Sequence, residues 1–238
     1  KLPGKNHVEA LVSHDNFASL ELFVPGNVGP FRVKQFTAAT QTRFAPKILD
    51  LWGYSGDYFS EQEQETLVAL ARAPCFQQVD TLVLERGLGR VTRFVKEVTE
   101  HALMPQLHTL VWRSFGPVVL GLQEMMPLFE RVRKLALTLL AYGEYKLSGW
   151  DAYLGIVLPE SIEVIDISGL NHDLATGYHG SIQPMIFSTD EIKTRAFEQL
   201  CDSALLRHIK HINIGPLFFD EVVLEVFERR RPDIAVHP

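Results

Sequence analysis

The chain has 238 residues, and its 46% hydrophobic and 22% charged residues are ordinary globular usage, which excludes a disordered or collagen-like chain. The 29 Asp and Glu residues outnumber the 23 Lys and Arg residues and give a formal net charge of −6, so we expect no nucleic-acid partner. The longest nearly apolar run, 135–142, is far shorter than the about 20 residues that span a bilayer, so we expect no membrane partner.

A six-residue phrase recurs along the chain: an apolar residue, two variable residues, an apolar residue, one variable residue and a final apolar residue. Copies that keep all three apolar positions begin at residues 17, 79, 107, 132, 162 and 209, and a weaker copy begins at Pro46. The alternation that ends each phrase is typical of a short strand, so we predict about seven of them. An eighth short strand is expected over 231–236, with Ile234 and Val236 as its inward pair.

Segments with helical spacing lie between these phrases. Ser60 is a good N-cap for a helix that stops at Pro74. Further apolar stripes with helical spacing span 91–98, 118–129, 192–205 and 222–227. Pro127 is expected to end or bend the helix in which it lies. Because a unit of one strand and one helix cannot bury its own apolar face, the units must stack, with parallel strands joined by crossover connections.

The phrase and the helices between its copies resemble the leucine-rich repeat family, specifically the ribonuclease-inhibitor-like branch that includes F-box leucine-rich proteins. This resemblance covers about residues 17–214 and implies a right-handed α/β solenoid, with a parallel sheet of about seven short strands on the concave side and helices outside. Family repeats usually carry Asn or Cys three residues after the phrase, whereas this chain has Pro25, Tyr54, Gly87, Phe115, Leu140, Leu170 and Leu217 there. Without an asparagine ladder, other hydrogen bonds or water must hold the turns.

The domain organisation follows from the period of the repeat. We predict a single domain over residues 1–238, because no segment has the composition of an interdomain linker. Residues 1–16 have the pattern of the end of a preceding unit. Residues 169–190 break the period and are predicted as an inserted loop, which either packs back on the fold or stays mobile.

The motifs that carry chemistry are weak. A wound dinucleotide-binding sheet is the structural alternative, but the glycine turn at 87–90 lacks both a third glycine and a GK[ST] ending, so we interpret it as a tight turn. His172, Asp173 and His179 match no common zinc-ligand spacing. The sequence therefore predicts no catalytic residue, no metal site and no cofactor.

The cysteine usage points to a reducing compartment. Only two cysteines, Cys75 and Cys201, are present, far apart and without a CxxC spacing. Both lie among apolar neighbours and are interpreted as small buried hydrophobic residues. We expect the protein in the cytoplasm or the nucleus.

The most informative positions lie between the inward residues, because alternate side chains of a strand point to opposite faces. The predicted concave face carries aromatic residues and charges of both signs, which are common in binding hot spots. We predict these partner-binding residues: Phe23, Asp50, Trp52, Glu85, Arg113, Lys134, Asp166 and His211. The alternative to a binding role is an ordinary covered sheet surface, built from residues such as Val83 and Val111.

These patterns favour a non-enzymatic protein-binding scaffold, within a complex of several subunits. The resemblance to F-box leucine-rich proteins implies the substrate-receptor part of a ubiquitin ligase. Two alternatives stay open. One is a small-ligand or metal-binding protein or enzyme that uses the 169–190 loop, with His172, Asp173, Tyr178 and His179. The other is a structural subunit of a larger assembly.

Overall fold

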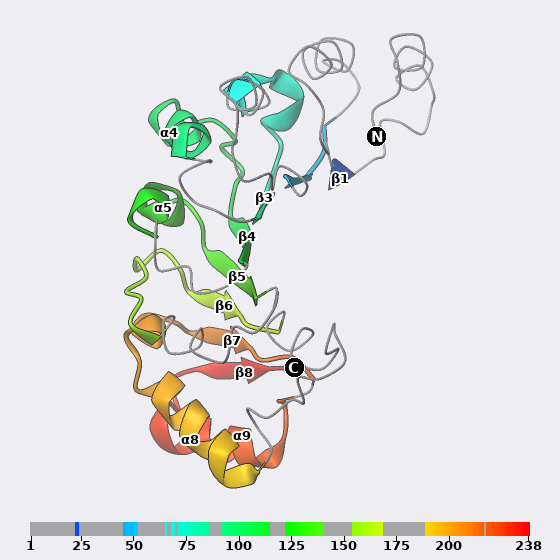
Figure 1. Ribbon diagram of the computed structural model, residues 1–238. Coiled ribbons are helices and arrows are strands. Elements are labelled where there is room, and N and C mark those ends of the chain that lie inside the picture. Colours follow the sequence, from blue (N-terminus) through cyan, green and yellow to red (C-terminus); the bar gives the residue numbers. More distant parts are fainter. Residues whose placement is uncertain are drawn as a thin grey trace, which may run out of the picture. The chain divides into compact units, whose positions relative to one another are not determined.

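The structure is a computed structural model, and two compact units make up the chain (Figure 1). The structure describes residues 22–23, 45–51, 65, 68–69, 71–85, 92–114, 122–139, 154–168, 189–216 and 218–238. The N-terminal unit consists of Lys1–Val111 and Gln123–Arg131, and the C-terminal unit consists of Trp112–Leu122 and Val132–Pro238. The single domain over 1–238 stays a prediction.

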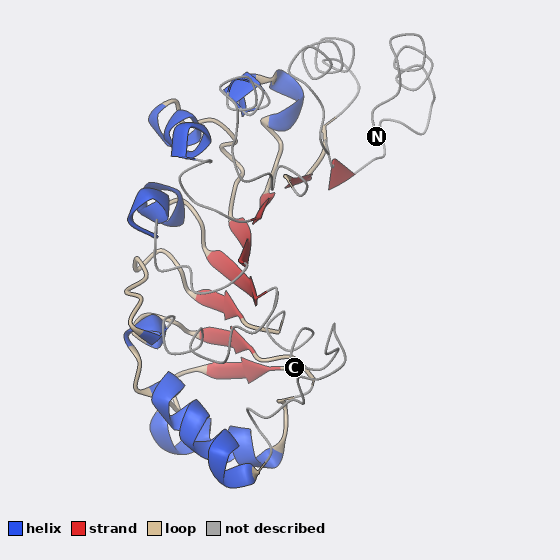
Figure 2. Cartoon of the chain, in the orientation of Figure 1, coloured by secondary structure: helices blue, strands red, loops and turns tan. Residues whose placement is uncertain are grey.

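The fold is α/β with an open parallel sheet, as the sequence predicts. The described strands follow one another in chain order through the sheet (Figure 2). They are β1 (Leu22–Phe23), β2 (Ile48–Asp50), β3 (Thr81–Glu85), β4 (Thr109–Ser114), β5 (Lys134–Leu139), β6 (Val164–Asp166), β7 (His211–Asn213) and β8 (Ala235–His237). Parallel pairing joins β1, β2 and β3 in the N-terminal unit, and β5, β6, β7 and β8 in the C-terminal unit.

The inward positions of the phrases form the core of each unit. At most 6% of the surface is exposed at Leu49, Leu51, Leu82, Leu84, Leu110, Trp112, Leu135, Leu137, Ile165, Ile167, Ile212 and Ile214. In the C-terminal unit the register sets Leu135, Ile165 and Ile212 opposite one another on neighbouring strands. An eighth strand is present as predicted, but β8 spans Ala235–His237 and not 231–236, with Ile234 buried before it and Val236 half-buried within it.

Strand β1 departs from the predicted register. The sequence places Phe23 in the series that points away from the core, but the pairing sets Phe23 opposite Leu49, whose series is inward, and Leu22 opposite Ile48. A strand has a side-chain period of two, so an odd-numbered slip in pairing exchanges its two faces.

The described helices overlap the predicted helical stripes. They are α4 (Thr92–Glu100), α5 (Leu122–Phe129), α8 (Asp190–Cys201) and α9 (Glu221–Arg230), with short 3₁₀ turns η2 (Pro74–Phe76) and η5 (Ala204–Leu206). Pro127, expected to end or bend the helix, lies inside α5, which continues for two more residues and ends at Phe129. In the C-terminal unit α8 packs against α9 (Figure 1), and the rings of Phe197 and Phe227 meet edge to face with their centroids 6.2 Å apart.

The stripe predicted over 192–205 is divided in the structure. Helix α8 begins after Thr189, whose side chain accepts a hydrogen bond from the backbone N–H of Ile192, and it ends at Cys201. The hydroxyl of Ser203 donates to the carbonyl oxygen of Leu200 at 2.6 Å, which satisfies a carbonyl group at the helix end before η5 starts. Ile192, predicted on the apolar stripe, is 44% exposed because it lies in the first turn.

The backbone repeats one turn before the strands. In four phrases the first residue donates its N–H to the carbonyl three residues earlier, in the pairs Val79–Phe76, Leu107–Met104, Ile162–Pro159 and Ile209–Leu206, and Ile234 makes the same bond to Arg231 before β8. The next residue accepts two N–H bonds from the following strand: the carbonyl of Glu163, for example, accepts from Lys210 and His211 at 2.9 and 3.1 Å. The phrase found in the sequence is therefore a repeat of backbone geometry as well.

Candidate interaction face of the sheet

Strands β5 to β8 present a continuous set of side chains opposite to the core. We define the open face as Lys134, Ala136, Val164, Asp166, His211, Asn213, Ala235 and His237. The register aligns Lys134, Val164, His211 and Ala235 in one row. A second row consists of Ala136, Asp166, Asn213 and His237. Every residue of this face is half-buried or exposed, in contrast to Leu135, Ile165 and Ile212, which lie between them in β5, β6 and β7 and are buried.

Asp166 is the centre of a polar network on the open face. Its Oδ2 lies 3.2 Å from Lys134 Nζ and accepts a bond of 3.3 Å from the side-chain amide of Asn213. Its Oδ1 accepts from the backbone N–H and the hydroxyl of Ser168, at 3.1 and 2.6 Å. Because these donors contact both of its oxygens, the carboxylate of Asp166 is held in a fixed position on the sheet.

Asn213 links the network to the turn after β7. Its Oδ1 accepts a 3.1 Å bond from the backbone N–H of Gly215. Gly215 has a φ of 73°, the left-handed region that glycine adopts without steric cost. The side chain of Asn213 is therefore fixed at both ends, by the carboxylate and by the turn.

Two histidines meet at the exposed end of the open face. His211 Nδ1 and His237 Nε2 are 3.2 Å apart, a distance at which one ring nitrogen donates to the other. The rings are stacked, with centroids 5.5 Å apart and planes inclined by 24°. The sequence analysis missed this pair, although the alternation of the predicted eighth strand already puts His237 on the same face as His211.

Of the predicted binding residues of the N-terminal half, the structure describes the side chain of Asp50 alone. Asp50 in β2 is only 7% exposed, so it offers little surface to a partner. Glu85 and Arg113 lie in β3 and β4, but their side chains are not among the described ones. Trp52 lies outside the described residues. Of the predicted set, the structure brings together Lys134 and Asp166 and places His211 on the same face.

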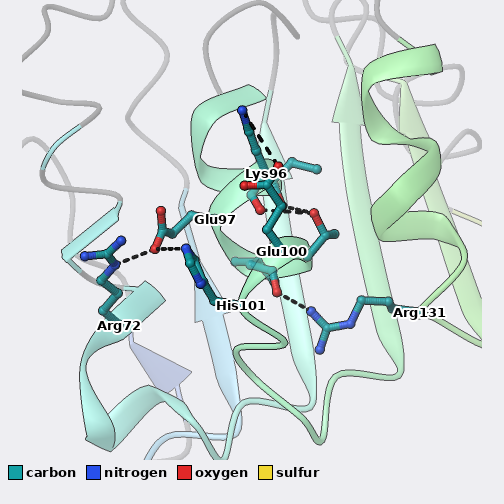
Figure 3. A network of polar contacts seen from close by, with 9 residues as sticks. Arg72, Lys96, Glu97, Glu100, His101 and Arg131 are labelled. Atoms are coloured by element: carbon teal, nitrogen blue, oxygen red, sulfur yellow. Dashed lines mark hydrogen bonds and ion pairs between the residues drawn. The ribbon is translucent and has the colours of Figure 1, made fainter.

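Side-chain bonds to the backbone hold the turn after α4, in line with the expectation that other hydrogen bonds stabilise the turns of a chain without an asparagine ladder. Ala102 and Met104 in this turn have φ values of 49° and 52°, a left-handed conformation that is costly for residues other than glycine. The guanidinium of Arg131, labelled in Figure 3, donates to the carbonyls of Val98 and Leu103, at 2.6 and 2.7 Å. Gln77 Oε1 accepts from the N–H of Met104 at 2.9 Å, so side chains fix the turn from two sides.

An ion pair at the surface joins α4 to the preceding segment. Arg72 Nε contacts Glu97 Oε1, and Glu97 also lies 3.5 Å from His101 Nε2 (Figure 3). The hydrogen bond from Arg72 holds the pKa of Glu97 below its usual range. In the same helix, Lys96 Nζ and Glu100 Oε1 form an i,i+4 ion pair with a separation of 3.7 Å. Such exposed pairs stabilise helices slightly and do not form a site.

The described residues contain no group of three or more His, Cys, Asp or Glu side chains that could hold a metal ion. Cys75 and Cys201 are buried, and burial raises the pKa of the Cys201 thiol to about 12, so it is a poor nucleophile at neutral pH. The alternative cluster of His172, Asp173, Tyr178 and His179 and the glycine turn at 87–90 lie outside the described residues.

The arginines at the end of α9 are engaged within the C-terminal unit. Arg229 contacts Glu198 at 2.5 Å, and Arg230 contacts both Glu198 and Asp202, at 3.2 and 3.0 Å. Arg231 pairs with Asp233 and donates to the carbonyl of Leu206 at 2.9 Å. This basic run therefore joins α9 to α8 and to the turn before β7.

No protein-family model matches the chain, and no curated protein matches it at a significant level. None of the helices among the described residues is long and apolar enough to cross a membrane.

Proposed function

We propose that the chain is a non-enzymatic interaction module that binds another protein through the open face. The observation that carries this proposal is the contrast between the two sides of β5 to β8. One side is a closed core in which Ile165 and Ile212 have no exposed surface, whereas the other holds a fixed polar network and an exposed histidine pair. Pre-organised polar groups on a rigid sheet lose little entropy when they meet a partner.

The fold proposed for this function is a right-handed leucine-rich-repeat-like solenoid with the open face on its concave side. The recurring phrase supports it, as does the recurring turn before the strands. Parallel strands in one sheet are almost always joined by right-handed crossovers, and stacked-repeat proteins commonly bind through their concave surface. The finer proposal, a substrate receptor of a ubiquitin ligase in the cytoplasm or nucleus, rests on the resemblance of the phrase to F-box leucine-rich proteins.

The test is a quantitative affinity purification from native lysate that compares the wild-type chain with Ala235→Arg. Ala235 is exposed and aligned with His211, so a long side chain there obstructs the open face, and the alanine methyl group that it replaces makes no hydrogen bond or ion pair. The matched control is Arg207→Glu, an exposed position in the turn after η5. Circular dichroism checks that each variant is folded.

We expect partners that are captured by the wild type and by Arg207→Glu but lost with Ala235→Arg. Ubiquitin-ligase subunits among them support the finer proposal. Partners that bind Ala235→Arg as well as the wild type contradict the assignment of the open face. A loss that is equal in both variants contradicts it too, because the effect then does not depend on the face.

A further inference from the structure

The histidine pair on the open face has a placement that β-sheet geometry makes rigid. Strands β7 and β8 are parallel, with His211 opposite Ala235 and Asn213 opposite His237. His211 and His237 are thus diagonal neighbours on one face, carried by backbones that the sheet fixes. Both side chains are exposed, so a ligand from solvent reaches them without the opening of the core.

The separation of the two ring nitrogens suits a chelated metal ion. With a zinc–nitrogen bond of about 2.0–2.1 Å, two nitrogens on one ion lie about 2.9 Å apart at a right angle and about 3.4 Å apart at a tetrahedral angle. His211 Nδ1 and His237 Nε2 are 3.2 Å apart, within this interval. A metal ion therefore needs only rotation of the two exposed rings, with the strands left in place.

The neighbouring polar groups leave the two imidazoles as the protein's ligands. The oxygens of Asp166 already accept from Lys134, Ser168 and Asn213, and the Asn213 amide is used by Asp166 and the turn. The remaining coordination positions of an ion then fall to water or to a side chain of a bound partner. Ala235, opposite His211, is small and exposed and leaves room beside the ring.

We propose that His211 and His237 form a two-imidazole site for a borderline divalent transition-metal ion of the zinc and copper class. Neutral imidazole nitrogens favour this class, whereas Mg²⁺ and Ca²⁺ require oxygen ligands. In the metal-free protein the hydrogen bond between the rings holds the two nitrogens together. On binding, the proton on the donating nitrogen moves to the other nitrogen of that ring, so both facing nitrogens have lone pairs for the ion.

The test is calorimetric titration of the full chain with Zn²⁺ in a His172→Ala/His179→Ala background, which removes the other histidine cluster. We expect one saturable site. Either His211→Ala or His237→Ala should weaken it by about a hundredfold, since loss of one ligand removes the advantage of two linked ligands. The control is His108→Ala, an exposed histidine whose Nδ1 contacts its neighbour Thr109 in the N-terminal unit.

A second readout identifies the ligands directly. With one equivalent of Cu²⁺, electron paramagnetic resonance should show coupling to two imidazole nitrogens, reduced to one in either single variant. The proposal is overturned by the absence of saturable Zn²⁺ binding, by binding that survives both substitutions, or by binding that His108→Ala removes equally. It is also overturned by equal affinity for Mg²⁺, which indicates carboxylate ligands. None of these results depends on whether a protein binds the open face.

Discussion

The two compact units repeat the same backbone turn before their strands, yet they stabilise it with different side chains. In the N-terminal unit, Gln77 and Arg131 hydrogen-bond directly to main-chain groups of a turn that contains two left-handed residues. In the C-terminal unit, Arg133, Glu163 and Lys210 occupy equivalent positions before β5, β6 and β7 and form an ion-pair row. The comparison shows that the repeat is defined by its backbone bonds and its core, while the outer side chains diverge freely.

The largest expected effect tests whether the two units depend equally on their cores. Leu82 in β3 and Ile212 in β7 have no exposed surface, so Leu82→Ala and Ile212→Ala each leave a cavity. We expect each to lower the free energy of unfolding by about 2–5 kcal/mol, measured by urea denaturation. The exposed Ala235→Ser is the control, with a change within about 0.5 kcal/mol. A core substitution as mild as this control would contradict the assigned burial.

The next effect separates the turn bonds of the N-terminal unit from surface ion pairs. Arg131→Met should cost about 1–3 kcal/mol in the free energy of unfolding, because carbonyl groups of the turn lose their donor. Burial lowers the pKa of Arg131, which agrees with a guanidinium held partly out of water. Arg131→Lys should recover part of the loss, since one ammonium replaces a two-pronged donor. Equal stability of the wild type and Arg131→Met would show that water replaces these bonds.

A smaller effect concerns the N-cap of α9. Asp220 Oδ1 accepts the N–H of Val223 at 3.0 Å, and its Oδ2 contacts Lys193 Nζ at 2.5 Å. Asp220→Ala should lower the free energy of unfolding by about 1 kcal/mol in thermal or urea denaturation. Asp220→Asn keeps the cap and loses the ion pair, so its free energy of unfolding should lie between those of the wild type and Asp220→Ala. An Asn variant no more stable than Ala would contradict the capping role.

The same residue predicts a direction of pH dependence. Burial raises the pKa of Asp220, but the bonds from Lys193 and Val223 outweigh it and leave the pKa below its usual range. A carboxyl whose pKa is lower in the folded than in the unfolded state adds stability above about pH 4, and this is lost as the pH falls through the folded value. The stability difference between wild type and Asp220→Asn should therefore disappear in acid.

The smallest effect is expected for the ion-pair row of the C-terminal unit. Hydrogen bonds from Lys210 and Arg133 lower the pKa of Glu163, but both cations are exposed. Glu163→Gln should therefore leave the unfolding temperature nearly unchanged, and any difference should vanish in high salt. The measurement is calorimetry at low and high ionic strength. A loss as large as that of Arg131→Met would remove the distinction between the two units.

The sequence by itself determined the strands and the core, because both depend on local alternation. The spacing of Ile162, Ile165 and Ile167 predicts a strand and its buried side without any knowledge of its neighbours, and the structure agrees. Pairing decided the register of β1, where the alignment of Phe23 with Leu49 in β2 departs from the series that the alternation predicts. The partner-binding role of the predicted face remains a proposal.

Only the tertiary structure decided which polar side chains meet. Arg131 bonds to the carbonyl of Val98, 33 residues earlier, and His211 meets His237, 26 residues later. No spacing rule connects such pairs, since their separation depends on the lengths of the intervening helix and turns. Hydrophobic burial is set residue by residue along the chain, whereas a hydrogen bond needs two groups placed within a few tenths of an ångström, and only stacking of the repeats supplies that placement.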